Sequence, residues 1–483
     1  MRISVVLHTA GIFLRYFALT FALPVVVSLL YHEWRDAQAF AVSGVLAGAV
    51  GQLMMRARSA AAEDLTRVEG LAIVSGTWLL LAVAAALPFL ASGLGVIDAL
   101  FESMSGLTTT GATVIRDFSQ HGHGIFFWRA LTQWFGGMGV IALFVAILPR
   151  FGIAGRQLFF AEAPGPTDQP LTPRIRKTAR ALWLVYAGLT SAEIAALLAT
   201  GMPVFDSVCH ALATLAAGGF SPHPLSIGGY ANPAAEWVIT FFMFAAGANF
   251  ALHYRTLRGE TRAFLRDEEF RAYLAIVLVA TVLLTACLLP SAPRTVEAVR
   301  TAAFQVLSIL TTTGFASVDF QLWNDQAKMV LLTLMFIGGC AGSASGGPKV
   351  VRQVLIARYT LLELRRTLHP RGVLPVKLGG RVVPDEVMRA VLVFFLFYLL
   401  VFAVCTLVVS AFGADMMTAI TASIACLGNI GPGFNAVGPM ASFADLHPVS
   451  RITLTLAMWI GRLEVVTVLA LVRPEVWRLV RRG

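Results

Sequence analysis

The stretch Leu107-Thr108-Thr109-Thr110-Gly111-Ala112-Thr113 returns in altered form three times further along the chain. The other copies are Leu215-Ala216-Ala217-Gly218-Gly219-Phe220, Leu310-Thr311-Thr312-Thr313-Gly314-Phe315-Ala316 and Leu427-Gly428-Asn429-Ile430-Gly431-Pro432-Gly433. Each copy ends a short apolar run with small or hydroxyl residues and a glycine, and we align Gly111, Gly218, Gly314 and Gly431. Glycine suits a loop that must adopt backbone conformations closed to residues with a Cβ. The sequence therefore predicts four equivalent loops in one chain.

Composition places these loops in a membrane protein. Of the 483 residues, 57% are hydrophobic and only 13% are charged, and the mean hydropathy is +0.75. Soluble domains carry about 25% charged residues. Only helices and closed barrels satisfy their own backbone in lipid, and long continuous apolar runs of about 20 residues favour helices.

Ten runs are long enough to cross a bilayer. They are residues 12–31, 38–55, 70–92, 126–148, 181–200, 234–254, 271–290, 328–346, 388–411 and 452–472. Most of the 37 basic residues then fall on one side, with a concentration in 349–389. The positive-inside rule puts that side, and both termini, in the cytoplasm. Topology thus accounts for the net charge of +10 without a nucleic-acid partner.

A short apolar segment precedes each glycine loop, at residues 97–108, 204–216, 296–312 and 414–427. These segments are too short to cross the bilayer, which predicts four re-entrant pore helices. Each has an acid near its start, where a carboxylate complements the positive end of a helix. The acids are Asp98, Asp206, Glu297 and Asp415. The negative helix ends then converge on the glycine loops, which favours a cation.

The predicted fold class is an all-α integral membrane protein with four consecutive units around one central pore. Each unit reads as a long helix, a pore helix, a filter loop and a second long helix, and a two-helix hairpin precedes them. The predicted boundaries are 1–69 for the hairpin and 70–150, 151–258, 259–360 and 361–483 for the units.

The loop carbonyls are expected to replace the hydration shell of an ion. The candidate ion-binding residues are Thr109, Thr110, Gly111, Ala216, Ala217, Gly218, Thr312, Thr313, Gly314, Asn429, Ile430 and Gly431. For a single copy, close helix packing through small residues would be the better explanation. Four matched copies after short helices favour a filter, and no cofactor is predicted.

These loops resemble those of the Trk/Ktr/HKT superfamily of potassium transporters, and within it the bacterial TrkH-type subunits. The resemblance covers all four units and includes Gln133-Trp134-Phe135-Gly136-Gly137-Met138-Gly139, Gly338-Gly339-Cys340-Ala341-Gly342-Ser343 and Gly461-Arg462-Leu463-Glu464. It implies K⁺ uptake across a bacterial inner membrane, a cytosolic nucleotide-binding regulatory subunit and a homodimer. In the second loop, Ala216 and Ala217 stand where the family more often has hydroxyl residues.

The last helix of the third unit contains a cluster of small residues. They are Gly338, Gly339, Gly342, Ser343, Ser345, Gly346, Gly347 and Pro348. Glycine and proline at this density do not sustain a helix, so we expect a break inside the membrane. A tight helix crossing is the alternative, whereas the resemblance implies a gating loop. Lys349 and Arg352 follow directly and are expected to face the cytoplasm.

Arg462 is the single basic residue deep in the last predicted span. An intramembrane charge is costly and usually faces an interior cavity. We expect Arg462 in the pore cavity near the gating loop, where its charge would raise the barrier to a cation. A purely structural ion pair is the alternative.

Other function classes fit the chain less well. An intramembrane enzyme would need paired acids or a histidine cluster in the spans, and Glu193, Arg462 and Glu464 do not form one, so no enzyme is predicted. A sodium- or proton-coupled symporter would be expected to show two inverted repeats rather than four parallel ones. A sodium-preferring member of the same superfamily stays open because of Ala216 and Ala217.

Overall fold

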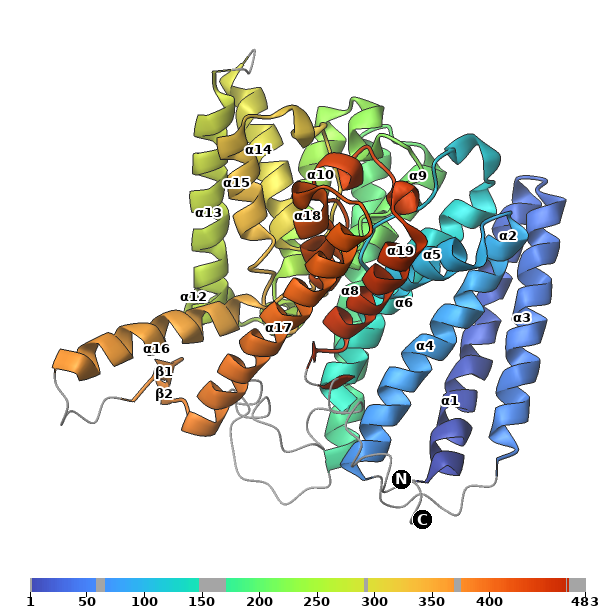
Figure 1. Cartoon of the computed structure of the whole chain (residues 1–483), viewed down its shortest axis with the longest axis horizontal. Helices are drawn as coiled ribbons and strands as arrows, with labels where there is room; N and C mark the ends of the chain where they lie inside the picture. Colours follow the sequence, from blue (N-terminus) through green and yellow to red (C-terminus); the bar gives the residue numbers. More distant parts are fainter. Residues whose placement is uncertain are drawn as a thin grey trace.

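The computed structural model describes residues 2–57, 66–146, 171–290, 294–368, 375–465 and 467–468. The described part is mostly helical, as Figure 1 shows. Its one sheet is an antiparallel hairpin of β1 (Lys377–Leu378) and β2 (Arg381–Val382), which turns at two glycines with positive φ. The expected all-α class is confirmed in this part of the chain.

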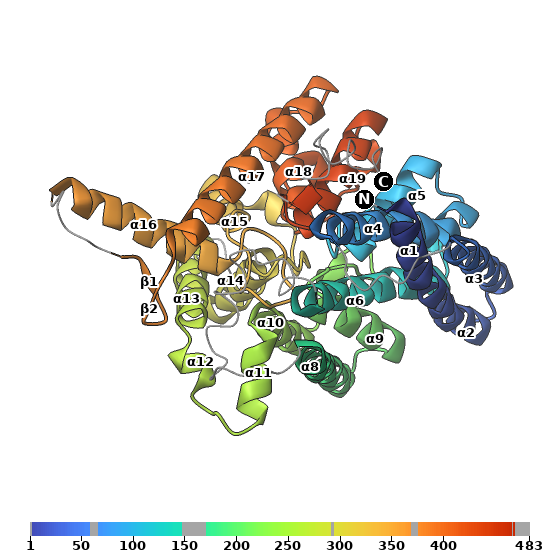
Figure 2. The same cartoon turned by 90° about the horizontal axis from the view of Figure 1, so that it is seen from below.

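The N-terminal hairpin consists of α1 (Ile3–Ala18), α2 (Ala22–Leu30) and α3 (Trp34–Met55). Its arms cross closely, because a Cβ on Gly11 would lie 2.8 Å from the Gly51 carbonyl oxygen. Phe21 and Phe40 pack around Trp128, with ring centroids 4.5 and 5.9 Å from it. Trp128 belongs to α6, so the hairpin lies against the first unit at the edge of the molecule (Figure 2).

The four predicted units follow one another around a common centre in Figure 2. The first contains α4 (Arg67–Ala91), α5 (Val96–Leu107) and α6 (His123–Ala146). The second contains α8 (Leu171–Ala199), α9 (Val204–Leu215), α10 (Pro233–Gly247) and α11 (Phe250–Leu257). The third contains α12 (Ala263–Arg266), α13 (Glu268–Leu288), α14 (Thr295–Leu310), α15 (Asp325–Leu334) and most of α16 (Val350–Leu368). The fourth contains α17 (Asp385–Ala411), α18 (Met416–Leu427) and α19 (Pro448–Arg462).

Six helices of the described part are long and apolar enough to cross a membrane, or seven if the bent pair α10–α11 counts as one span. The six are Ile3–Leu30, Trp34–Met55, Val68–Ala91, Ala179–Ala199, Glu268–Leu288 and Asp385–Ala411. They coincide with six of the ten predicted runs and indicate a membrane protein. The ten-span layout as a whole stays a prediction.

Three predicted spans are wrong as continuous helices. The run 234–254 is divided between α10 and α11, which meet at 99°, and the Asn249 side chain caps α11. The run 328–346 stops as a helix at Leu334, in keeping with the predicted break. The run 452–472 stops at Arg462, and Glu464 adopts a left-handed backbone with φ 65°. Residues 147–148, 466 and 469–472 of the predicted spans lie outside the described residues.

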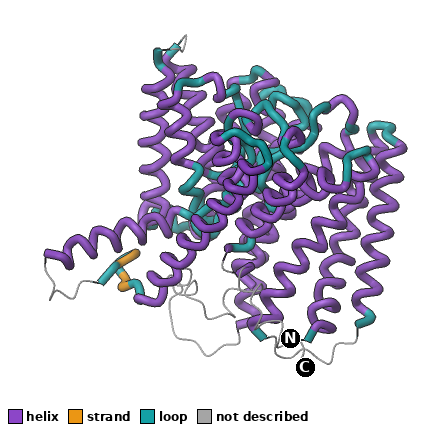
Figure 3. Tube along the Cα trace, viewed as in Figure 1, coloured by secondary structure: helices purple, strands orange, loops and turns teal. Residues whose placement is uncertain are grey.

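The helix α16 leaves the bundle and runs outward at an angle, next to the start of α17 (Figure 1). Leu355 and Leu362 of α16 pack with Val376, Val383 and Val387 in a small separate core. Irregular segments instead gather among the helices near the centre of the bundle, as the tube in Figure 3 shows. Backbone without regular hydrogen bonding is tolerated at membrane depth only where protein or water surrounds it. The centre is therefore the place to look for a functional site.

Candidate functional site

All four short helices end in loops with the same backbone course. One residue past each helix cap lies a non-glycine residue in the left-handed region, and two residues further lies a glycine with positive φ. The first set is Thr109 (φ 53°), Ala217 (54°), Thr312 (58°) and Asn429 (55°). The glycines are Gly111 (φ 82°), Gly219 (76°), Gly314 (82°) and Gly431 (101°). Left-handed φ costs a residue with a Cβ about 1–2 kcal/mol, so four matching instances indicate one shared geometry.

The structure corrects the alignment of the second loop by one residue. Gly219, and not Gly218, is the counterpart of Gly111. The Gly218 N–H bonds the Ala213 carbonyl at 2.8 Å, as the Thr110 N–H bonds the Ser105 carbonyl at 2.8 Å. The prediction failed because two glycines stand side by side and only the backbone distinguishes them. Ala216 and Ala217 consequently correspond to Thr108 and Thr109.

The four glycines close a ring, each lying against the carbonyl of the next loop. A Cβ on Gly111 would lie 2.2 Å from the Gly218 oxygen, one on Gly219 1.9 Å from that of Thr313, one on Gly314 2.1 Å from that of Ile430, and one on Gly431 2.7 Å from that of Thr110. Real Cβ atoms do not approach within 3.0 Å, so all four positions require glycine. The cyclic order places the four loops around one axis.

Hydroxyl groups hold the first and third loops in the same way. The side chains of Thr108 and Thr110 hydrogen-bond each other at 2.8 Å, and so do those of Thr311 and Thr313. The loops also accept a serine hydroxyl from the preceding helix, from Ser105 to the Ala112 carbonyl and from Ser308 to the Phe315 carbonyl, at 2.6 and 2.5 Å. These hydroxyls therefore fix the backbone, and it is the carbonyls that are left for a ligand.

Amide side chains take over this role in the other two loops. Gln133 Nε2 donates to the Gly218 carbonyl at 2.6 Å, and Gln133 Oε1 accepts the Phe220 N–H at 3.1 Å. Asn429 Nδ2 donates to Thr110 Oγ1 and to the Met458 carbonyl, both at 3.0 Å. The sequence showed Gln133 as part of a motif, but its hydrogen bonds to Gly218 and Phe220 could not be predicted, because these residues are far away along the chain.

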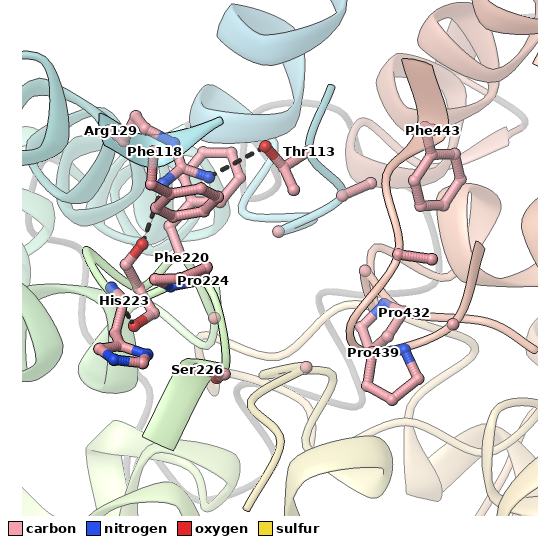
Figure 4. A pocket seen from close by; sticks show the side chains of 18 residues that line it. Thr113, Phe118, Arg129, Phe220, His223, Pro224, Ser226, Pro432, Pro439 and Phe443 are labelled. Atoms are coloured by element: carbon pink, nitrogen blue, oxygen red, sulfur yellow. Dashed lines mark hydrogen bonds between the residues drawn. The ribbon is translucent and has the colours of Figure 1, made fainter. Parts of the chain in front are cut away.

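A cavity opens on one side of the ring and is lined by residues of all four units, as Figure 4 shows. Arg129 lies at its edge, where Nη2 donates to Thr113 Oγ1 at 3.1 Å and Nη1 to the Ser221 carbonyl at 3.0 Å. Arg129 Nε also donates to Glu102 Oε1 at 2.8 Å. The two charged side chains are 2% and 0% exposed, so this ion pair is fully buried. It joins the first loop to the second, and the sequence analysis missed it.

The four acids at the starts of the short helices lie as expected in the first turn or at the cap. Asp415 caps α18 and accepts the Thr418 N–H at 3.1 Å. The hydrogen bonds from Thr418 lower the pKa of Asp415, so its charge persists at the positive end of the helix. Asp98 of α5 forms an ion pair with Arg451 of α19, which ties the fourth unit to the first.

An irregular segment, residues 335–349, lies against the other side of the ring. The Gly346 N–H donates to Thr312 Oγ1 at 2.6 Å. The Cys340 N–H bonds the Gly247 carbonyl at 2.9 Å, at the bend between α10 and α11. Glu269 Oε1 accepts the Ala341 N–H at 2.6 Å and so holds the segment to α13. Backbone N–H groups that a continuous helix would have paired are thus paired here with a hydroxyl, a carboxylate and a carbonyl of other elements.

Arg462 lies against this segment and is 6% exposed. Its Nη1 donates to the Ala344 carbonyl at 3.0 Å and its Nη2 to the Gly136 carbonyl at 3.4 Å. A small cavity beside it is lined by Ser345, Tyr398 and Lys349, among others.

The expectation that Lys349 faces the cytoplasm is wrong. Lys349 is 7% exposed and donates to the Ser345 carbonyl, because its left-handed backbone turns it inward. Arg352 forms an ion pair with Glu464 at 2.6 Å.

The described residues contain no group of three or more His, Cys, Asp and Glu side chains that could hold a metal ion. Carbonyl oxygens are the groups concentrated at the ring, and such groups bind a hard monovalent cation without any charged ligand.

Comparison with known proteins identifies relatives over the whole length. The family model described as TrkH, cation transport protein, matches residues 36–478. The Trk system potassium uptake protein TrkH of Salmonella typhimurium is 40% identical over 488 residues, covering 99% of this chain and 100% of the relative. The Escherichia coli K12 protein of the same name is 39% identical with the same coverage. The crystal structure of the potassium transporter TrkH from Vibrio parahaemolyticus superposes with a TM-score of 0.91 at 37% identity, covering 99% of this chain and 100% of that one.

Proposed function

Since the chain belongs to the TrkH family of cation transport proteins, we propose that it takes up potassium through a pore whose selectivity filter is the ring of glycine loops. It is a membrane transporter and not an enzyme. The observation that carries the proposal is the cyclic contact of Gly111, Gly219, Gly314 and Gly431 with the carbonyls of the next loops. Four loops give this order only when they surround one axis.

The chemistry of the filter is the exchange of water for carbonyl oxygens. The carbonyls of Thr110, Gly218, Thr313 and Ile430 would replace part of the hydration shell of K⁺. The negative ends of the four short helices add a favourable potential. The proposed ion-binding residues are Thr109, Thr110, Gly111, Ala216, Ala217, Gly218, Thr312, Thr313, Gly314, Asn429, Ile430 and Gly431, with Gly219 added from the backbone geometry. Thr109 Oγ1 and Asn429 Oδ1 have no hydrogen-bond partner in the described part and offer further oxygens.

The irregular segment 335–349 is proposed as the gate. Its gating-loop residues are Gly338, Gly339, Gly342, Ser343, Ser345, Gly346 and Gly347. The bond from Gly346 to Thr312 supports this role, because it puts the segment directly at the ring. Arg462 would raise the barrier to a cation there, since an unpaired positive charge in a low-dielectric cavity repels K⁺. Opening requires the segment to move and to release Arg462 from the Ala344 carbonyl.

The proposal extends to topology and location. We propose ten spans and four re-entrant pore helices in a bacterial inner membrane, with both termini in the cytoplasm. The distribution of Lys and Arg supports this orientation. The membrane potential would then drive K⁺ inward by about 2.3 kcal/mol per charge per 100 mV.

The proposed partners are a second copy of the chain and a cytosolic nucleotide-binding regulatory subunit. Support for the regulatory subunit comes from α16 and the hairpin after it, which project from the bundle (Figure 1). They carry the exposed basic residues Arg365, Lys377 and Arg381, and Arg389 is exposed at the start of the adjoining α17. A basic cytoplasmic surface fits an acidic docking face.

Flux through the purified protein in liposomes tests the proposal. K⁺ and Na⁺ uptake would be measured for the parent and for Gly314→Ser, whose new Cβ would meet the Ile430 carbonyl. We expect strong K⁺ preference in the parent and its collapse in the variant. Equal K⁺ and Na⁺ flux in the parent would favour a sodium-tolerant filter, for which the missing hydroxyls at Ala216 and Ala217 give a reason. Flux that saturates and requires a Na⁺ or H⁺ gradient would favour a coupled symporter.

A further inference from the structure

The second loop keeps a helix-to-loop contact from His210 to Ser221, but it lacks the serine hydroxyl and the threonine pair that hold the first and third loops. Where those have Ser105 and Ser308, the second has Ala213, and no threonine pair follows. Gly218 replaces the threonines at 110 and 313, so its backbone also has more conformational freedom than theirs. If one of the four filter loops were mobile, its carbonyl oxygens would not stay at fixed positions around the ion.

Gln133 of α6 fills the space that the missing side chain leaves. A Cβ on Gly218 would lie 2.4 Å from Gln133 Cδ, so the amide stands where a threonine side chain would be. Gln133 is fully buried, and it bonds the loop on both sides of Gly219, at the Gly218 carbonyl and the Phe220 N–H. The equivalent carbonyls of Thr110, Thr313 and Ile430 accept no such bond within the described residues.

We propose that Gln133 is a positioning residue that sets the ion specificity of the filter by holding the second loop. The inference rests on the proposed function. The Gly218 oxygen has two lone pairs, so the bond from Gln133 leaves one for the ion while it fixes the direction of the carbonyl. Without it, the loop could contract around the smaller Na⁺, and the discrimination that depends on carbonyl placement would fall.

The test is the K⁺/Na⁺ permeability ratio of Gln133→Leu in liposomes. Leucine has a similar volume and removes both hydrogen bonds. We expect the ratio to fall about tenfold or more, because two neutral hydrogen bonds are lost, while K⁺ flux itself continues. Gly218→Ala is a second variant, because its Cβ displaces the amide without altering α6, and it should lower the ratio in the same way.

A serine graft separates positioning from packing. Adding Ala213→Ser to Gln133→Leu gives the second loop a serine hydroxyl directed at the Phe220 carbonyl, equivalent to the serine hydrogen bonds of the first and third loops. This addition should restore most of the K⁺/Na⁺ permeability ratio. Thr240→Val is the matched control, since Thr240 is buried in α10 and its hydroxyl bonds only the Glu236 carbonyl within the described part. It should leave the ratio unchanged.

The outcomes distinguish this inference from the proposed function. A parent without K⁺ preference would overturn the filter itself. A selective parent whose ratio survives in both Gln133→Leu and Gly218→Ala would overturn the role of Gln133 alone. A lowered ratio that Ala213→Ser does not restore would also overturn it, because Gln133 would then act through general packing.

Discussion

The buried ion pair of Glu102 and Arg129 should show a large energetic coupling. Glu102→Gln or Arg129→Met alone is expected to lower the free energy of unfolding by about 3–5 kcal/mol, because each leaves its partner buried and unpaired. The double variant removes both charges. It should be destabilised by clearly less than the sum of the two single variants.

The magnitude follows from the contacts. Arg129 Nε lies 2.8 Å from Glu102 Oε1, and the side chains are 2% and 0% exposed. At about 4 Å between charge centres and an effective dielectric constant of 20, the attraction is about 4 kcal/mol. Arg129 also lies over the Phe220 ring, 4.1 Å from its centroid, so Arg129→Met loses a further contact that the coupling energy does not include. We therefore expect a coupling of about 4 kcal/mol.

The assay is a double-mutant cycle by equilibrium unfolding in mixed micelles. Arg116 and Asp445 provide the control pair, since they form an ion pair of 2.7 Å in the loops of the same face but are 62% and 66% exposed. Their coupling should stay below about 1 kcal/mol. If the two cycles gave equal values, or if the Glu102 and Arg129 effects simply added within about 0.5 kcal/mol, the reasoning from burial would be refuted.

Two further variants test the ring and the proposed gate. Gly219→Ala should abolish K⁺ flux in liposomes, because its Cβ would lie 1.9 Å from the Thr313 carbonyl oxygen. Gly218→Ala should keep the flux, because its Cβ meets only the Gln133 side chain. Loss of flux in Gly218→Ala but not in Gly219→Ala would instead support Gly218 as the counterpart of Gly111. Arg462→Gln should raise ⁸⁶Rb⁺ uptake in the absence of any regulator, because the positive charge beside the gating loop is gone, with Arg15→Gln in the N-terminal hairpin as control; unchanged uptake would leave Arg462 a structural role only.

The general plan of the molecule could be predicted because it depends on local sequence. Apolar runs of sufficient length gave six helices where spans were expected, and the short helices end next to their glycines as expected. The cluster of glycines after Leu334 correctly predicted a break, since glycine lowers helix propensity wherever it stands. These features need no knowledge of what lies beside them.

The contacts between units could not be predicted in this way. A sequence pattern cannot distinguish the adjacent glycines Gly218 and Gly219. Only the contact with the Thr313 carbonyl shows that glycine is needed at position 219 of the ring. The bend after Gly247 is likewise set by a distant partner, because the Cys340 N–H takes up the Gly247 carbonyl. Lys349 is turned inward by a left-handed backbone that its own side chain does not favour.

The single chain has a consequence that a ring of four identical subunits could not have. Identical subunits must hold every filter loop with the same side chains, whereas here serine and threonine hydroxyls hold two loops and amides hold the other two. The amides also cross between quarters: Gln133 of the first unit holds the second loop, and Asn429 of the fourth bonds Thr110 of the first. The first quarter is therefore coupled to the second and to the fourth through different bonds. A substitution in one loop should then change selectivity by an amount that depends on the quarter, even where the backbone geometry is the same in all four.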